Sequence, residues 1–405
     1  PTFSDELKTL LTWADEVATL KVMANADTPS AARKALEFGA MGIGLCRTER
    51  MFNDVDRLPV VVEMILAATK DERDDALLRL KEMQRQDFKE ILLAMAQSTV
   101  TVRLLDPPIH EFLPTEDVLR DEIKNLQHLK DTVGGVANLF SSLRLINADV
   151  NLASKSNSPF DLSGVELVSQ AIQKKEQMLK KVKELHEVNP MLGHRGVRLG
   201  LTFPEIYMMQ IQALLEATAE CQKVGIDVRP EIMVPQVCTA EELAAVKLFV
   251  DESKQQIEKQ NHIKLNFKFG TMIEVVRACL QAEELAEVAE FFSFGTNDLT
   301  QATFSFSRED AENKFLPYYI TKGVIKDNPF EVLDKKAMGK LMKLAVNDGR
   351  NAKRDLKVGI CGEHGGHPES IQFCHTLGLN YVSCSGPRVP VARLAAAQAK
   401  LLSKN

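Results

Sequence analysis

Two acidic residues twenty-four positions apart, Glu274 and Asp298, give the strongest chemical signal in the sequence. Each follows a short apolar run, FKFGTMI (267–273) in the first case and FFSF (291–294) in the second. Such runs are typical of buried strands, and α/β enzymes place reactive groups at strand ends. The two carboxylates indicate a divalent cation, Mg²⁺ or Mn²⁺, because no histidine–cysteine cluster with zinc spacing accompanies them.

Other polar side chains follow predicted strands in the same way. They are Arg47, Arg103, Asp106, Asn297 and Cys361. Guanidinium groups are costly to bury unless they meet an anion, and their planar forks suit phosphate or carboxylate. Arg308, ten residues after Asp298, is a further candidate, so three arginines and a cation would hold a small, highly charged anion. His364 and His367, close to Cys361, are interpreted as turn or surface residues and not as ligands.

Each of these residues also has an ordinary structural explanation. Arg47 can pair with Glu49, and Arg103 with Asp106, as surface ion pairs of small energetic consequence. Glu274 or Asp298 alone can cap a helix or form an ion pair. The GTND segment (295–298) can be the capped start of a helix. Cys361 can be a small buried apolar side chain. Only the combination of residues favours a site.

Composition limits the functional classes. The 405 residues are 45% hydrophobic and 26% charged, which is typical of a globular chain with room for one large α/β domain. A net charge of −6 gives no basic surface for nucleic acid or an anionic membrane, and neither a membrane-length apolar run nor a signal peptide occurs. The seven cysteines form no CxxC pair, which favours reduced thiols in an intracellular compartment, the cytoplasm by default.

Short apolar runs alternate with helical patterns along the chain and predict eight strands. These runs are 20–27, 41–49, 98–106, 195–203, 228–237, 268–275, 291–298 and 356–364. The segments between them mostly carry apolar residues at helical spacing. Strand and helix alternating eight times predict an α/β fold, a (β/α)₈ TIM barrel over residues 18–405.

Two segments fall outside this alternation. A helix is predicted over residues 4–17, because Ser4 is suited to the N-cap and acidic residues follow it. We interpret residues 1–17 as a linker helix that enters the barrel. The stretch at about 107–165, between the third and fourth predicted strands, is interpreted as an insertion with a mobile polar tip at 154–164.

Longer motifs give the chain a family resemblance. They are GIGLCRTERMF (42–52), TVRLLDPPIHEFLP (101–114), NPMLGHRGVRLG (189–200), PEIMVPQV (230–237), GTMIE (270–274), FFSFGTNDLTQATFSFSRED (291–310), GICGEHGG (359–366) and YVSCSGPRVPVARLAAAQ (381–398). Over nearly the whole chain, they resemble the C-terminal phosphoenolpyruvate/pyruvate domain of the pyruvate, phosphate dikinases. The sequence departs from the family pattern at Val275-Val276 and Gly386-Pro387.

The resemblance implies roles for individual residues. Those implied to bind substrate are Arg47, Arg103, Glu274, Gly295, Thr296, Asn297, Asp298 and Arg308. Glu274 and Asp298 would also hold Mg²⁺ or Mn²⁺. Cys361, with a thiol pKa near neutrality, would be the acid/base at the substrate methylene carbon. The implied reaction moves a phosphoryl group between phosphohistidine and pyruvate, through a metal-stabilised enolate, to form phosphoenolpyruvate.

The same resemblance implies partners. The phosphorylated histidine of the family stands on a separate domain, which an ATP-grasp domain charges, and the sequence carries neither the histidine motif nor a nucleotide-binding glycine-rich loop. Because the chain also begins at Pro1, we interpret it as a fragment or processed product that binds substrate without completing turnover. A homodimer formed through the barrel is expected.

Three alternatives remain from the sequence. The nearest is a domain like that of phosphoenolpyruvate synthase, which shares the motifs. A metal-dependent aldolase or lyase on the same barrel would also use an enolate, although it would not need three arginines for a phosphoryl group. A catalytically inactive relative could serve as a dimerisation or regulatory module.

Overall fold

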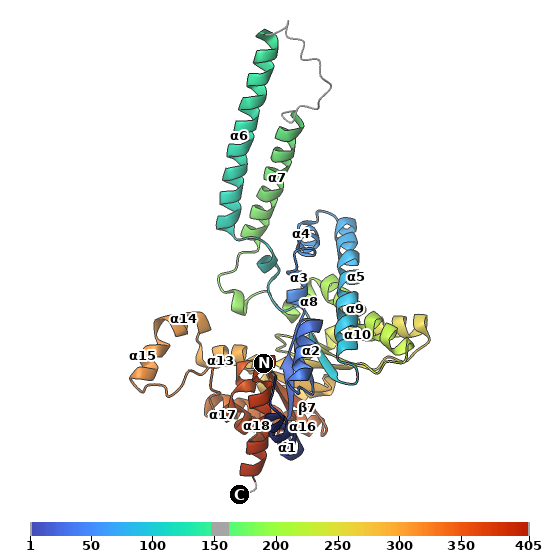
Figure 1. The fold of residues 1–405 in the computed structure, drawn as a ribbon, viewed down its shortest axis with the longest axis vertical. Helices are drawn as coiled ribbons and strands as arrows, with labels where there is room; N and C mark the ends of the chain where they lie inside the picture. Colours follow the sequence, from blue (N-terminus) through green and yellow to red (C-terminus); the bar gives the residue numbers. More distant parts are fainter. Residues whose placement is uncertain (1, 147–161, 404–405) are drawn as a thin grey trace.

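The computed structural model describes residues 2–146 and 162–403, and within them the strands form one closed barrel (Figure 1). The strands are β1 (Lys21–Asn25), β2 (Gly42–Arg47), β3 (Thr99–Arg103), β4 (Arg229–Val234), β5 (Lys268–Ile273), β6 (Phe291–Gly295), β7 (Lys357–Cys361) and β8 (Tyr381–Ser385). Each strand pairs in parallel with the next, and β8 pairs with β1. The predicted (β/α)₈ barrel is confirmed.

Helices cover the outside of the barrel. The α-helices are α1 (Asp5–Val17), α2 (Pro29–Glu37), α3 (Glu49–Phe52), α4 (Leu58–Leu66), α5 (Lys70–Ala94), α6 (Glu116–Ile146), α7 (Leu162–Glu184), α8 (Val197–Thr202), α9 (Pro204–Lys223), α10 (Ala240–Asn261), α11 (Val276–Leu280), α12 (Ala282–Val288), α13 (Thr296–Phe304), α14 (Arg308–Lys314), α15 (Leu316–Thr321), α16 (Ala337–Ala352), α17 (Pro368–Thr376) and α18 (Val389–Leu402). The 3₁₀ turns are η1 (Ile109–Phe112), η2 (Pro190–Leu192), η3 (Glu363–Gly366) and η4 (Gly386–Arg388).

One predicted strand is wrong, and one real strand was missed. Residues 195–203 alternate polar and apolar side chains, but they contain helix α8, which follows Gly196 in a left-handed conformation (φ 58°). Strand β8 has the sequence YVSCS, whose serines weaken its apolar pattern. Glu274, Asp298 and Cys361 therefore lie at the ends of β5, β6 and β7. The predicted strands at these positions were the sixth, seventh and eighth.

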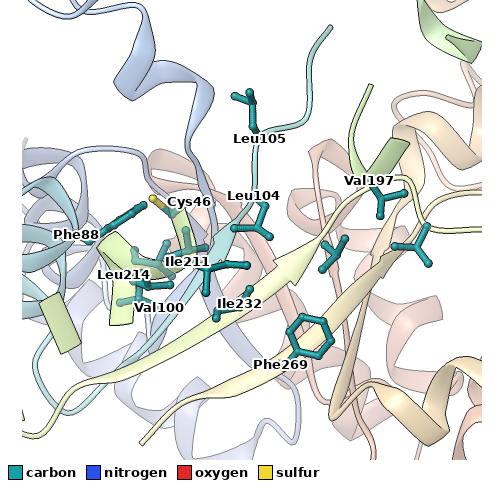
Figure 2. Packing of buried hydrophobic residues seen from close by; sticks show 14 of the residues in the cluster. Cys46, Phe88, Val100, Leu104, Leu105, Val197, Ile211, Leu214, Ile232 and Phe269 are labelled. Carbon is teal, nitrogen blue, oxygen red and sulfur yellow. The ribbon is translucent and has the colours of Figure 1, made fainter. Parts of the chain in front are cut away.

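Apolar side chains on the outer face of the strands bind the barrel to its helices (Figure 2). Val100 of β3 and Ile232 of β4 lie beside Ile211 and Leu214 of α9, with Phe88 of α5 next to them. All five are at most 1% exposed, and complete burial of such a side chain contributes about 1.5–3 kcal/mol. This layer holds the strands in register and therefore holds the strand ends in place.

The inner face of the strands carries a second set of residues. In β7, Val358 and Ile360 join the outer core, whereas Cys361 belongs to an inner cluster. The other members of this inner cluster are Leu45, Met233, Met272 and Phe291. Because side chains alternate along a strand, the residue type at each second position decides what faces the barrel interior.

An ion pair between a buried glutamate and a partly exposed lysine joins β4 and β7 near the start of both strands. Lys357 Nζ lies 2.7 Å from Glu231 Oε2, and the Thr101 hydroxyl donates to Glu231 Oε1 at 3.0 Å. The ammonium also lies 5.5 Å from the ring centroids of Phe291 and Tyr381. Glu231 is 3% exposed, so the pair satisfies charges inside the amino end of the barrel.

The excursion between β3 and β4 contains a helical hairpin that projects from the barrel (Figure 1). Helices α6 and α7 pack against each other, and Lys175 pairs with Glu122 at 2.6 Å. Helix α7 runs past the predicted insertion boundary at residue 165. Residues 154–161 of the predicted tip lie outside the described part of the chain, and residues 162–164 begin α7.

The predicted first helix is confirmed and belongs to the outer layer of the barrel. The Ser4 hydroxyl accepts a hydrogen bond from the backbone N–H of Leu7, which caps α1. Leu11 is buried, and α1 packs on α18, where Asp15 pairs with Arg393 at 2.6 Å. In the described residues, no helix is both long and apolar enough to cross a membrane.

Replacing Lys357 by methionine would leave Glu231 buried and unpaired while keeping most of the side-chain length. We expect the free energy of unfolding to fall by about 3 kcal/mol, measured by urea denaturation. The exposed pair of Lys247 and Asp251 on α10 is the matched control, and Lys247→Met should cost less than about 1 kcal/mol. Equal effects of the two substitutions would contradict the structural role of the pair of Lys357 and Glu231.

Candidate active site

The carboxyl ends of the strands bring the predicted site residues to one mouth of the barrel. Arg47, Arg103 and Cys361 are the last residues of β2, β3 and β7. Glu274 directly follows β5, and Asp298 lies in the first turn of α13, which begins immediately after β6. A closed parallel barrel places all of these ends on the same side, so residues far apart in sequence share one site.

Glu274 lies at the centre of the site and is 2% exposed. Its Oε1 accepts a hydrogen bond from the backbone N–H of Gln236 at 2.6 Å, whereas its Oε2 has no partner among the described residues. Burial, followed by the charge of Asp298, raises the pKa of Glu274 well above its ordinary value. A buried carboxylate oxygen without a partner is costly, so this environment fits a bound cation.

Asp298 lies beside Glu274 and is partly open to solvent. The side-chain amides of Gln236 and Gln301 each approach one of its oxygens at 3.4 Å, and Arg195 Nη1 is 3.8 Å from Oδ1. Glu274, Asp298 and both glutamines line one cavity. The described residues contain no cluster of three or more His, Cys, Asp or Glu suited to a metal. Two carboxylates fit Mg²⁺ or Mn²⁺, which commonly take their remaining oxygens from water or substrate.

Two arginines and two carboxylates form a largely buried network next to this cavity. Arg103 donates to Glu49 and lies 3.7 Å from Asp106 Oδ2, which in turn accepts from Arg195 at 2.6 Å. Burial lowers the pKa of Arg103, but Glu49 and Asp106 raise it above its ordinary value overall, so the guanidinium stays charged. Within the described chain, the Nε atoms of both arginines and Asp106 Oδ1 are buried without hydrogen-bond partners.

Arg47 pairs with a residue that the sequence did not indicate. Its backbone N–H donates to Asp27 Oδ1 at 2.8 Å, and its Nη2 lies 3.1 Å from Oδ2. Glu49, the partner considered from sequence, instead contacts Arg103. The Arg47 side chain is 34% exposed, so it lies closer to solvent than Arg103.

Arg308 is also paired before any ligand enters. Its Nη2 donates to both oxygens of Glu363 at 2.9 Å, its Nε donates to Glu312 at 3.1 Å, and its Nη1 donates to Asn297 at 3.1 Å. Asn297 and Glu363 are exposed. The three predicted arginines therefore differ, because Arg103 is buried while Arg308, like Arg47, is partly exposed.

Cys361 faces the inner cluster and is 3% exposed. Its Sγ lies 3.7 Å from the Ser293 hydroxyl and 3.8 Å from the Phe294 carbonyl oxygen. Burial raises the pKa of the Cys361 thiol to about 11, although Ser293 and Arg103 oppose the shift. This shift is opposite to the expected pKa near neutrality, and burial thus favours the protonated thiol over the thiolate.

His364 lies in the 3₁₀ turn η3, which agrees with its prediction as a turn residue, but it is buried and does not lie at the surface. It is 1% exposed, its Nε2 lies 2.9 Å from the Pro329 carbonyl oxygen, and its Nδ1 lies 2.6 Å from the Thr296 hydroxyl. A carbonyl only accepts, so Nε2 carries the proton and Thr296 donates to Nδ1. Burial lowers the pKa of His364, which favours this neutral form. The histidine thus connects η3, after β7, to the start of α13.

Known proteins are similar to this chain over nearly its whole length. Residues 2–401 match the family model described as PEP-utilising enzyme, PEP-binding domain. The chain belongs to this family of PEP-binding domains. It is 52% identical to pyruvate, phosphate dikinase of Entamoeba histolytica, over 97% of this chain and 40% of that protein. It is 45% identical to pyruvate, phosphate dikinase of Clostridium symbiosum, over 99% of this chain and 41% of that protein.

A third relative is also similar to nearly the whole chain and is likewise a longer protein. The chain is 47% identical to pyruvate, phosphate dikinase 1, chloroplastic, of Arabidopsis thaliana, over 98% of this chain and 37% of that protein. The PEP-binding domain described here thus spans about two fifths of the length of these curated relatives.

Besides Asp27 and Gln301, the sequence did not indicate Arg195 and Gln236 as residues of this site. Arg195 is the first residue of the segment wrongly predicted as a strand. Only strand ends were expected to carry site residues, so its contact with Asp106 was not predicted. Gln236 was counted inside the predicted strand 228–237, but β4 ends at Val234 and leaves Gln236 at the strand end. The strand-end rule that selected Glu274 would have selected Gln236 if the boundary had been right.

Replacing Glu274 by glutamine should stabilise the cation-free domain. The folded-state pKa of Glu274 lies above its unfolded value, so its contribution to stability is full below that unfolded value and is lost as pH rises through the folded pKa. Glutamine does not ionise, so the gain in melting temperature should be larger at pH 8 than at pH 5. The same variant should bind Mn²⁺ at least about tenfold more weakly. A lower melting temperature at pH 8 would contradict this account.

Replacing Gly295 by alanine should disturb Glu274 directly. A Cβ at this position would lie 2.6 Å from Glu274 Oε2 and 2.8 Å from Met272 Cε. We expect a loss of about 1–3 kcal/mol in stability, measured by denaturation, together with weaker cation binding. Gly135→Ala in α6 is the control, since its Cβ meets nothing within 4 Å and should stabilise the helix by up to about 1 kcal/mol. A Gly295→Ala variant as stable as the parent would refute the close contact.

Proposed function

We propose that this PEP-binding domain catalyses phosphoryl transfer between a phosphohistidine and pyruvate to form phosphoenolpyruvate, as part of a pyruvate, phosphate dikinase. The observation that carries the proposal is the buried Glu274 carboxylate, whose Oε2 lacks a partner within the described residues, beside Asp298 and near Arg103. Family membership supplies the substrate class, and relatives named pyruvate, phosphate dikinase supply the reaction.

The arginines support binding of a small anion with two charged groups. Arg103 carries its charge into the barrel mouth and has a buried Nε donor without a partner in the described structure. Arg47 and Arg308 are proposed to bind from the partly exposed side, where Arg308 would exchange Glu363 for the ligand. Gly295 at the end of β6, with Thr296, Asn297 and Asp298 in the first turn of α13, would add the remaining contacts.

Glu274 and Asp298 would hold Mg²⁺, with Mn²⁺ as a substitute. When bound, the cation supplies positive charge that stabilises the enolate form of pyruvate. The two carboxylates at the mouth of the barrel would balance this positive charge. One of them, Glu274, is held in place by the Gln236 backbone.

Cys361 is proposed to move the proton at the methyl carbon of pyruvate. In the direction that forms pyruvate, the protonated thiol gives its proton to the enolate carbon, and a thiolate remains. In the opposite direction the thiolate takes a proton from the methyl group of pyruvate, which forms the enolate. The enolate then accepts the phosphoryl group from phosphohistidine. Burial raises the pKa of the thiol, and Arg103 opposes that rise and so favours the thiolate that this step needs.

Further domains would complete the reaction. The greater length of the relatives supports a phosphohistidine domain and an ATP-grasp domain in the same protein. We also propose a homodimer formed through the barrel. A reducing intracellular compartment is proposed because all seven cysteines are free, although a chloroplast protein is among the relatives.

Binding and proton exchange by the isolated chain test the proposal together. We expect oxalate, a planar mimic of the pyruvate enolate, to bind in calorimetry only when Mg²⁺ is present. In D₂O with Mg²⁺, the chain should exchange the methyl protons of pyruvate, followed by proton NMR. Cys361→Ala should keep oxalate binding but lower the exchange rate at least about a hundredfold.

Glu274→Ala should abolish both readouts, because it removes a proposed cation ligand. Oxalate binding that does not depend on Mg²⁺, or exchange that Cys361→Ala leaves intact, would contradict the proposed roles. Cleavage of a 4-hydroxy-2-oxo acid without pyruvate exchange would instead favour an aldolase.

A further inference from the structure

Gln236 has an unusual backbone conformation at the edge of the site. Its φ of 62° is in the left-handed region, which non-glycine residues rarely adopt. Among the described residues, three other non-glycine residues share a positive φ, namely Gln97, His262 and Ser305. Gln236 is 4% exposed. Backbone strain of this kind is retained where the surrounding structure requires it, often at functional sites.

The conformation directs two groups of Gln236 at the two carboxylates. Its backbone N–H donates to Glu274 Oε1 at 2.6 Å, and its side-chain amide approaches Asp298 Oδ2 at 3.4 Å. Glu274 Oε1 is therefore occupied, and Oε2 is the oxygen left without a partner in the described chain. A single residue thus touches both carboxylates and leaves a defined oxygen of Glu274 free.

The neighbouring loop holds Gln236 in this position. A Cβ on Gly196 would lie 2.7 Å from Gln236 Cβ, so the glycine makes room for the glutamine side chain. The backbone N–H of Val197 donates to the Pro235 carbonyl at 3.1 Å, and that of Gly196 donates to the Asp106 carbonyl at 2.7 Å. The loop that contains Arg195 is therefore packed directly against Gln236.

We propose that Gln236 is the positioning residue of the cation site. Its backbone N–H holds one oxygen of Glu274, so that Oε2 alone binds the cation, and its side-chain amide orients Asp298 toward the same point. The inference rests on the proposed function, since it assumes a divalent cation between these carboxylates. Residues that orient metal ligands typically change metal affinity by ten- to a hundredfold when they are replaced.

Direct measurement of Mn²⁺ binding by electron paramagnetic resonance tests this role without relying on activity. Gln236→Leu keeps the backbone N–H and removes the amide, and we expect binding to weaken about tenfold. Gln236→Gly relieves the left-handed strain and frees the turn, so it should weaken binding at least as much while leaving the melting temperature equal or higher. A residue with only a structural role would not combine a higher melting temperature with weaker binding.

Gln97 provides a matched control. It is a glutamine with a φ of 69°, it is exposed, and it lies just before β3 at the opposite end of the barrel. Gln97→Leu and Gln97→Gly should leave Mn²⁺ affinity unchanged. If they weaken it as much as the Gln236 variants do, the effect is a general one and the proposal fails.

The outcomes separate this inference from the proposed function. Mn²⁺ binding that is strong in the parent chain, weak in Glu274→Gln and unchanged in both Gln236 variants would overturn the role of Gln236 alone. Binding that Glu274→Gln leaves intact, or no binding by the parent chain, would overturn the cation site and this inference with it. Weaker binding in both Gln236 variants, with unchanged binding in the Gln97 variants, would support the proposal.

Discussion

The Glu274 carboxylate, buried with one oxygen unsatisfied in the described structure, is the constraint on which the site depends. Burial raises the pKa of this carboxyl group well above its ordinary value, so its charged form is costly unless a cation is bound. The domain gives up stability here, and the same burial strengthens attraction to a cation in a site of low dielectric constant. Gly295 belongs to this arrangement, since any side chain there would occupy the space of the carboxylate.

Positive charge is arranged around that constraint in a graded way. Arg103 is buried and Arg195 is mostly buried, and both are neutralised by Glu49 and Asp106, with donor atoms still free in the described residues. Pairing arginines with carboxylates before substrate arrives avoids the cost of isolated buried charges. Under the proposed function, an arriving anion would exchange one set of partners of these arginines for another.

The sequence supported the barrel and most of the site for one physical reason. Apolar runs that end in polar residues reflect burial along a strand and exposure at its end, and this pattern located Glu274, Asp298 and Cys361. The pattern failed where alternating residues form a helix, and where a strand is not uniformly apolar. Residues 195–203 have the alternation of a strand but contain α8, and β8 is a strand in which Ser383 is buried although it is polar.

The residue types and their order in the chain, which are sequence properties, determined the fold class, the pair of carboxylates and the number of available arginines. Tertiary structure alone decided the partners, because pairing depends on which strand ends become neighbours when the barrel closes. It paired Arg47 with Asp27, buried His364 against Thr296 and raised the pKa of the Cys361 thiol through burial. Local sequence carries no information about such distances, because the interacting residues approach only after the strands have assembled.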